Sequence, residues 1–236
     1  MLKYHRIHHS TYNAYVLNGF DVNWLLKKIQ FYRDNNTPPF YSSVPNRKTF
    51  YDEERNVYIK IVDESWKRFG LLSKWLPFHK TSDKYLKFYK VLEQLQISTP
   101  KLLACMKIKK DRPKSVIATE GIADAQSMIS FSSSLPDSTM KAITIQELAK
   151  TAAFLHGKGY YFSMEPRNIF VKVKDRKVQL YLLDLEHMKP AGLFFKRRIK
   201  RNLRRFKGSL MFEANKNLDD WNTFMGHYKN AFTPLG

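Results

Sequence analysis

Residues 155–186 of this 236-residue chain are LHGKGYYFSMEPRNIFVKVKDRKVQLYLLDLE, and this segment carries the clearest structural signal in the sequence. It begins where a helical pattern over residues 144–156 ends, and the inward face of that helix holds Ile145, Leu148, Ala152 and Leu155. Thr144 and Glu147 have the spacing of a capping box at the start of the helix. Two apolar runs follow, at 169–173 and 178–183, and the polar turn between them predicts an antiparallel hairpin.

Upstream of this segment, two further hairpins are predicted on either side of a helix. The first pairs residues 49–51 with 57–62, and the second pairs 102–106 with 115–119. Between them, residues 85–95 have apolar side chains at helical spacing, and the helix ends before Pro100. Residues 1–45 give no clear assignment, and residues 190–236 are helical and basic. The mixture of hairpins and helices predicts the α+β class.

Composition limits the classes of partner and compartment. The chain has 41 Lys and Arg against 21 Asp and Glu, a formal charge of +20, which favours anionic partners such as nucleic acid, phosphorylated glycans, nucleotides or acidic lipid. Cys105 is the single cysteine, which excludes an intrachain disulfide and a zinc cluster and favours a reducing compartment. No uninterrupted apolar run is long enough to span a bilayer, and the first ten residues lack a secretory signal. We expect a cytoplasmic protein.

Three residues match the needs of phosphoryl transfer, in which a cation holds the phosphates and oxygen ligands hold magnesium. Lys60 projects from the middle of the 57–62 strand, as the phosphate-binding lysine of kinases does, although a surface lysine on an edge strand is the simpler interpretation. Asn168 opens a strand shortly after a helix, where either a magnesium ligand or a turn residue fits. Asp184 follows an apolar strand, where either a metal ligand or a helix cap fits. Their order along the chain favours the functional interpretation.

Four stretches together resemble the lipopolysaccharide core kinases of Gram-negative bacteria, the family of the Kdo and heptose kinases. They are residues 57–60, residues 155–159 together with 166–171, residues 182–186 and the basic helix that follows. The resemblance also includes the helix leading to residues 99–101 and covers about residues 45–228. It implies a protein-kinase-like bilobal fold. Residues 1–120 would form a small antiparallel-sheet lobe with one long helix, and residues 121–236 a mostly helical lobe. It also implies ATP and Mg²⁺ as cofactors, and a core sugar on a lipid anchor as acceptor. The protein would then act at the cytoplasmic face of the inner membrane as a peripheral protein.

The resemblance also implies roles for individual residues. Lys60 would hold phosphates, Asn168 and Asp184 would hold magnesium, and the backbone from Glu120 to Ile122 would meet adenine. The position of the catalytic base, five residues before Asn168, holds Ser163 instead of Asp.

A serine hydroxyl is no equivalent base near neutral pH, and Glu165 is the one carboxylate of this loop. The stretch before the lysine strand, residues 44–48, contains no glycine, and the predicted helix of residues 85–95 gives Lys60 no clear acidic partner. Two functions therefore stay open. One is an active sugar kinase that uses Glu165, and the other is a kinase-like binding or scaffold protein of envelope biogenesis that has lost its chemistry.

Residues 196–207 contain eight cations, and apolar residues, among them Ile199 and Leu203, recur along one helical side. Such a helix fits an anionic inner-membrane surface, a solvated basic face on a packed helix, or a nucleic-acid patch. The last is disfavoured because no zinc motif or RNA-binding signature accompanies it. Residues 66–76 form a second aromatic and apolar stretch, either membrane-facing or part of the core.

Overall fold

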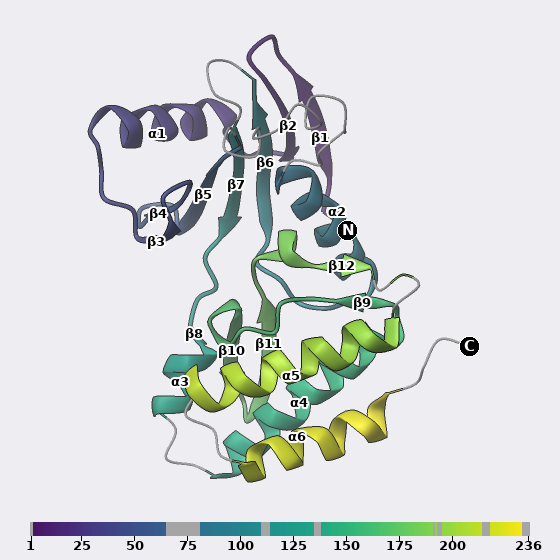
Figure 1. Cartoon of the computed structure of the whole chain (residues 1–236). Helices are drawn as coiled ribbons and strands as arrows, with labels where there is room; N and C mark the ends of the chain where they lie inside the picture. The colour runs from purple at the N-terminus through teal and green to yellow at the C-terminus, as the bar shows by residue number, and fades with distance from the viewer. Residues whose placement is uncertain are drawn as a thin grey trace. The chain divides into compact units, whose positions relative to one another are not determined.

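The structure is a computed structural model that describes residues 2–64, 81–109, 114–134, 138–190, 192, 195–213 and 218–232. The chain forms two compact units (Figure 1). The first unit comprises Met1–Tyr89 and Pro100–Gly121, and the second comprises Lys90–Thr99 and Ile122–Gly236. The sequence places a boundary between residues 120 and 121, and the units divide one residue later. The predicted stretch at 66–76 lies outside the described residues.

The first unit is built on a seven-stranded sheet whose strand pairs are all antiparallel, so the α+β prediction is confirmed. The strand order is β1-β2-β6-β7-β5-β4-β3. The strands are β1 (Tyr4–His8), β2 (Tyr12–Leu17), β3 (Tyr41–Val44), β4 (Arg47–Asp52), β5 (Val57–Asp63), β6 (Leu102–Ile108) and β7 (Lys114–Glu120). Both predicted hairpins are confirmed, as β4–β5 and β6–β7.

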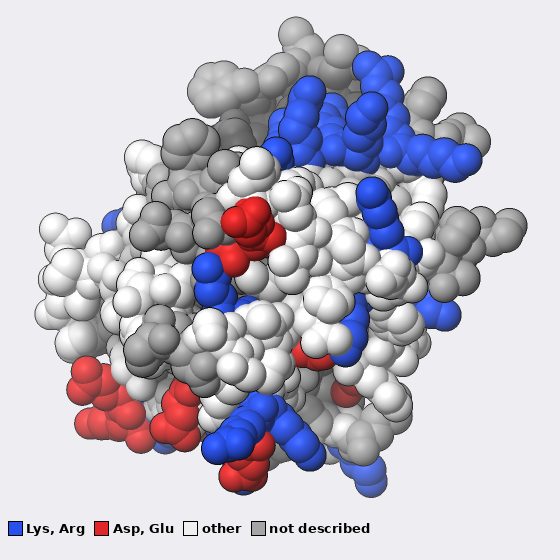
Figure 2. All heavy atoms as spheres, turned by 90° about the horizontal axis from the view of Figure 1, so that it is seen from below, with Lys and Arg blue, Asp and Glu red and all other residues white. Residues whose placement is uncertain are grey.

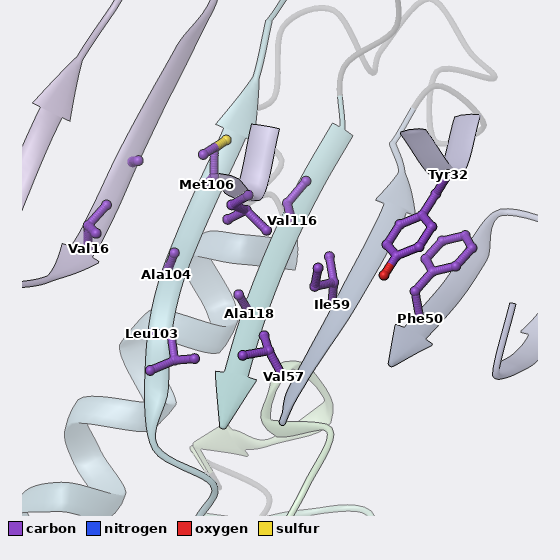
Figure 3. Close-up of a cluster of buried hydrophobic side chains, with 12 residues drawn as sticks. Val16, Tyr32, Phe50, Val57, Ile59, Leu103, Ala104, Met106, Val116 and Ala118 are labelled. Atoms are coloured by element: carbon purple, nitrogen blue, oxygen red, sulfur yellow. The ribbon is translucent and has the colours of Figure 1, made fainter. Parts of the chain in front are cut away.

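One helix covers each face of this sheet, because both faces are apolar. Helix α1 (Val22–Asp34) packs Leu25 and Tyr32 against a buried cluster that includes Ile59 and Met106, and the Tyr32 ring stacks on Phe50 at 4.3 Å (Figure 3). Helix α2 (Thr81–Gln94) lies on the other face and is predicted by the sequence, whereas α1 falls in the unassigned residues 1–45. Among the described residues up to Glu120 the structure therefore has two helices, α1 and α2, where the sequence predicts one long helix.

The second unit is mostly helical. Its helices are α3 (Met128–Ser134), α4 (Ser138–Gly157), α5 (Phe195–Glu213) and α6 (Leu218–Ala231). A three-stranded sheet has the order β11-β10-β8, from β8 (Ala125–Ser127), β10 (Ile169–Lys174) and β11 (Lys177–Leu182). Strand β9 (Tyr160–Tyr161) pairs with β12 (Lys189–Pro190). The predicted hairpin is confirmed as β10–β11.

Helix α4 begins at Ser138, well before Thr144, so the predicted capping box at Thr144 is wrong. The Thr144 hydroxyl donates to the carbonyl oxygen of Met140 at 2.8 Å, the bond of a threonine inside a helix. The helices pack around an apolar core in which Phe206 of α5 and Phe224 of α6 are almost fully buried, with ring centroids 5.2 Å apart. Within the described residues, no helix has both the length and the apolar character needed to cross a bilayer.

Candidate functional site

The loop between β9 and β10, residues 162–168, carries the predicted base positions and Asn168. A buried polar network fixes its start. Asn202 of α5 donates from Nδ2 to the Phe162 carbonyl oxygen at 2.9 Å, and its Oδ1 lies 3.2 Å from His156 Nε2. His156 Nδ1 lies 2.9 Å from the Tyr228 hydroxyl of α6. Three helices thus hold one carbonyl group of the loop.

Burial determines the protonation state of this network, and the hydrogen bonds determine which atoms donate. Burial lowers the pKa of His156 to about 4, against an opposing effect of its hydrogen bond with Asn202, so the imidazole is neutral at neutral pH. Because Asn202 Nδ2 donates to Phe162, its Oδ1 accepts from His156 Nε2–H. His156 Nδ1 is then the acceptor, and Tyr228 donates to it. Burial also raises the pKa of Tyr228, which keeps this donor protonated.

The two predicted base positions form one hydrogen-bonded pair. The Ser163 hydroxyl donates to Glu165 Oε1 at 2.9 Å, and Arg167 Nε lies 3.2 Å from Glu165 Oε2. The Glu165 side chain is 41% exposed, so solvent screens this ion pair and reaches the carboxylate. Glu165 can accept a proton from a bound hydroxyl, while Ser163 and Arg167 orient its carboxylate.

The two predicted metal ligands lie at the same end of the β10–β11 hairpin. Ile169 pairs with Leu182, and the next backbone bond runs from Leu183 N–H to the Asn168 carbonyl oxygen at 2.9 Å. Asp184 follows directly, with φ 55° and ψ 44°, in the left-handed region that few residues other than glycine adopt. Asp175 in the β10–β11 turn also has a left-handed φ, so the assignment of Asp184 as a candidate ligand rests on its neighbours and not on its backbone.

Asp184 belongs to a group of side chains that can bind a cation. One ligand atom each of Asp184, Glu186 and His187 lies within 4.8 Å of the others, and Glu186 is buried. The two carboxylates supply oxygen donors of the kind that Mg²⁺ prefers, so these residues fit a magnesium ion. Sequence reasoning missed Glu186 and His187 as site residues. The signal was present, because both follow Asp184 within three positions in a single 3₁₀ turn.

The remaining predicted residues are divided between the two units. Lys60 is half-buried in the middle of β5 and pairs with Ile117, on the α2 face of the sheet. Glu120 ends β7, with Lys101 Nζ 3.2 Å from its Oε2. Ile122 opens the main segment of the second unit. Lys60 and Glu120 therefore belong to the first unit, whereas Ile122 belongs to the second unit with the magnesium candidates.

A pocket of about 490 Å³ lies beside the loop, and we call it the loop pocket. Its walls come from the loop, from the β12 segment and from α5. The polar residues of its lining include Ser163, Glu165, His187, Lys189, Arg205 and Ser209. The second unit thus places a solvent-accessible carboxylate in a cavity that also contacts His187 of the candidate cation site.

No protein-family model and no curated protein sequence matches this chain.

Proposed function

We propose that this protein transfers the terminal phosphoryl group of ATP to a hydroxyl of a lipopolysaccharide core sugar at the inner membrane. The observation that carries the proposal is the arrangement at one end of the β10–β11 hairpin. There, the residue before Asp184 is hydrogen-bonded to Asn168, since the Leu183 N–H donates to the Asn168 carbonyl oxygen. The neighbouring loop carries Glu165, which lines the loop pocket. A kinase-type reaction needs this combination of metal ligands and a nearby proton acceptor.

Each residue has a part in the proposed reaction. Asp184 and Asn168, with Glu186 beside Asp184, would hold Mg²⁺, which would neutralise phosphate charge when bound. As the resemblance implies, Lys60 would contact the phosphates and the Glu120–Ile122 backbone would meet the adenine. Glu165 accepts the proton of the acceptor hydroxyl, with its carboxylate oriented by Ser163 and Arg167.

The test is phosphate transfer from labelled ATP to dephosphorylated core glycolipid by the full chain. Asp184→Asn keeps the size of the side chain and is expected to lower the rate about 100-fold or more, because a metal ligand contributes several kcal/mol to transition-state stabilisation. Asp175→Asn is the matched control, because Asp175 also has a left-handed backbone (φ 51°) but lies in the turn at the far end of the same hairpin. Equal rates for wild type and Asp184→Asn would contradict the proposal.

One observation favours a second function, a kinase-like binding or scaffold protein in envelope biogenesis. Ser163 stands at the base position, and both oxygens of Glu165 already have partners in Ser163 and Arg167. Such a protein would bind nucleotide without turnover. Measurable turnover that is lost in Glu165→Gln would reject it, whereas ATP binding without turnover would favour it over the kinase.

Helix α5 supports binding to an anionic membrane surface. Between residues 196 and 205 the helix exposes three pairs of adjacent residues, spaced four positions apart, and all six residues are Lys or Arg. We call these the cationic stripe: Lys196, Arg197, Lys200, Arg201, Arg204 and Arg205. None of the six forms a salt bridge with a described residue. Figure 2 shows a group of Lys and Arg side chains without Asp or Glu along its upper edge. This edge is the side that faces the viewer in Figure 1, where α5 lies in front of α4.

Co-sedimentation with vesicles tests the membrane part of the proposal. Each cation near an anionic surface contributes about 1 kcal/mol, so Lys200→Ala, Arg201→Ala and Arg204→Ala together should weaken binding to phosphatidylglycerol vesicles about 100-fold. The matched control removes three exposed cations at the β10–β11 turn, Lys174, Arg176 and Lys177. Similar losses in both triple variants would mean that only net charge matters and would refute a specific role of the stripe.

A further inference from the structure

One wall of the loop pocket is a single face of α5. Asn202, Arg205, Phe206 and Ser209 line it at the three- and four-residue spacing of a helical face. Two of these residues have structural roles, since Asn202 is hydrogen-bonded to the loop and Phe206 is 1% exposed in the aromatic core. Arg205 and Ser209 therefore supply the polar groups of this wall. Arg205 also belongs to the cationic stripe, so the pocket and the exposed cations are continuous along the helix.

The opposite wall adds a second positive charge. Lys189 lies in β12, which pairs with β9 through Tyr161, and its exposed side chain lines the pocket together with His187. Neither Lys189 nor Arg205 forms a salt bridge with a described residue. The carboxylate in the lining belongs to Glu165, and its charge is matched by Arg167, which is not part of the lining. The cavity consequently presents two unmatched cations near the proposed proton acceptor.

We propose that the loop pocket is an oxyanion subsite in which Arg205 and Lys189 bind an anionic group carried by the acceptor sugar. A guanidinium and an ammonium facing one cavity favour a phosphate or a carboxylate, and the Ser209 hydroxyl adds a neutral donor. The subsite would hold the acceptor with its reactive hydroxyl near Glu165. The identification of the ligand as the acceptor sugar rests on the proposed kinase function, whereas the anion site itself is defined by the residues of the pocket.

Ligand-observed NMR titrations of the full chain test the subsite, with glucose 1-phosphate, glucuronate and glucose as probes. Glucose 1-phosphate should bind, and glucose should bind at least about tenfold more weakly, because charge-assisted hydrogen bonds dominate the contact. Glucuronate tests whether the site prefers phosphate. Binding as tight as that of glucose 1-phosphate would identify a general oxyanion site, whereas weaker binding would identify a phosphate site. Either result supports the proposal, whereas equal binding of all three sugars overturns it.

Variants locate the binding. Arg205→Ala should weaken glucose 1-phosphate binding about tenfold, since one charge-assisted contact is lost. Arg204→Ala is the matched control, because Arg204 is an exposed cation of the same helix that does not line the pocket. Equal losses in the two variants would overturn the proposal.

Failure of the subsite and failure of the kinase function give different results. Anion binding that depends on Arg205, in a protein that transfers no phosphate from ATP, would keep the subsite and reject the kinase. Phosphate transfer with an unchanged KM for the acceptor in Arg205→Ala would reject the subsite alone. Thermal denaturation of both variants confirms that they are folded, as expected for exposed positions.

Discussion

The buried imidazole of His156 should make the stability of this protein depend on pH in a defined range. His156 is fully buried, and its pKa falls from 6.5 to about 4 on folding. When the pKa of a histidine is lower in the folded state, a falling pH protonates the unfolded chain before the folded one. Its contribution to stability is therefore complete above pH 6.5 and is lost as the pH falls toward 4.

The magnitude follows from the two pKa values. Between pH 7.5 and pH 5, preferential protonation of the unfolded chain lowers the free energy of unfolding by about 2 kcal/mol, and by about 3 kcal/mol near pH 3. His156→Gln removes the titrating group but keeps a hydrogen-bonding side chain. The variant should be less stable than wild type at pH 7.5, and this difference should shrink by about 2 kcal/mol at pH 5.

Urea unfolding at both pH values measures the difference, because other groups titrate alike in the two proteins and cancel. His8→Gln is the control, since His8 is an exposed residue of β1 and its replacement should change stability little at either pH. A difference between wild type and His156→Gln that stays constant from pH 7.5 to pH 5 would show that His156 is not held neutral. The assignment of donors and acceptors in the buried polar network of His156, Asn202 and Tyr228 would then be wrong.

Three further predictions concern stability. Gly121→Ala would place a Cβ 1.9 Å from Asn56 Oδ1, so Asn56 must move and lose its hydrogen bond to the Gly121 carbonyl oxygen. We expect the free energy of unfolding, measured by chemical denaturation, to fall by about 1–3 kcal/mol. An unchanged denaturation midpoint would contradict the close approach of Asn56 to Gly121. Asp52→Asn removes the charge that faces Lys28 Nζ at 2.6 Å, and a loss of about 1–3 kcal/mol is expected, absent in a Lys28→Met background. Phe206→Ala should cost about 3–5 kcal/mol because the ring is 1% exposed; a calorimetric loss below 1 kcal/mol would exclude this packing.

The sequence predicts the strands of the first unit well because they alternate on a two-residue period. Val57 and Ile59 face the α1 side of the sheet, and their neighbours face the other side, as hairpin pairing requires. Helix α1 escapes prediction because its apolar residues are not confined to one face. Leu25 and Tyr32 are buried, yet Phe31 is 53% exposed on the same helix, which blurs the pattern.

The parts of the site that are local in sequence could be predicted, and the parts that depend on long-range packing could not. Asn168 and Asp184 belong to one hairpin, so the hairpin pattern alone places them together. Lys189 and Arg205 reach the loop pocket through the pairing of two-residue strands and the packing of α5, and neither of these contacts is local in sequence. The convergence of Lys60 with Asp184 on one nucleotide remains a prediction.

The division of the chain has a consequence for anyone who cuts the protein into fragments. Residues 90–99 belong to the second unit, where Ser98 accepts a bond from Leu182 N–H at 3.0 Å and Thr99 donates to the Leu182 carbonyl oxygen at 2.9 Å. A fragment that starts at residue 122 would lack these partners just ahead of Asp184. No single cleavage leaves the second unit intact, so expression of residues 122–236 alone is expected to give material that misfolds or needs residues 90–99 supplied in trans.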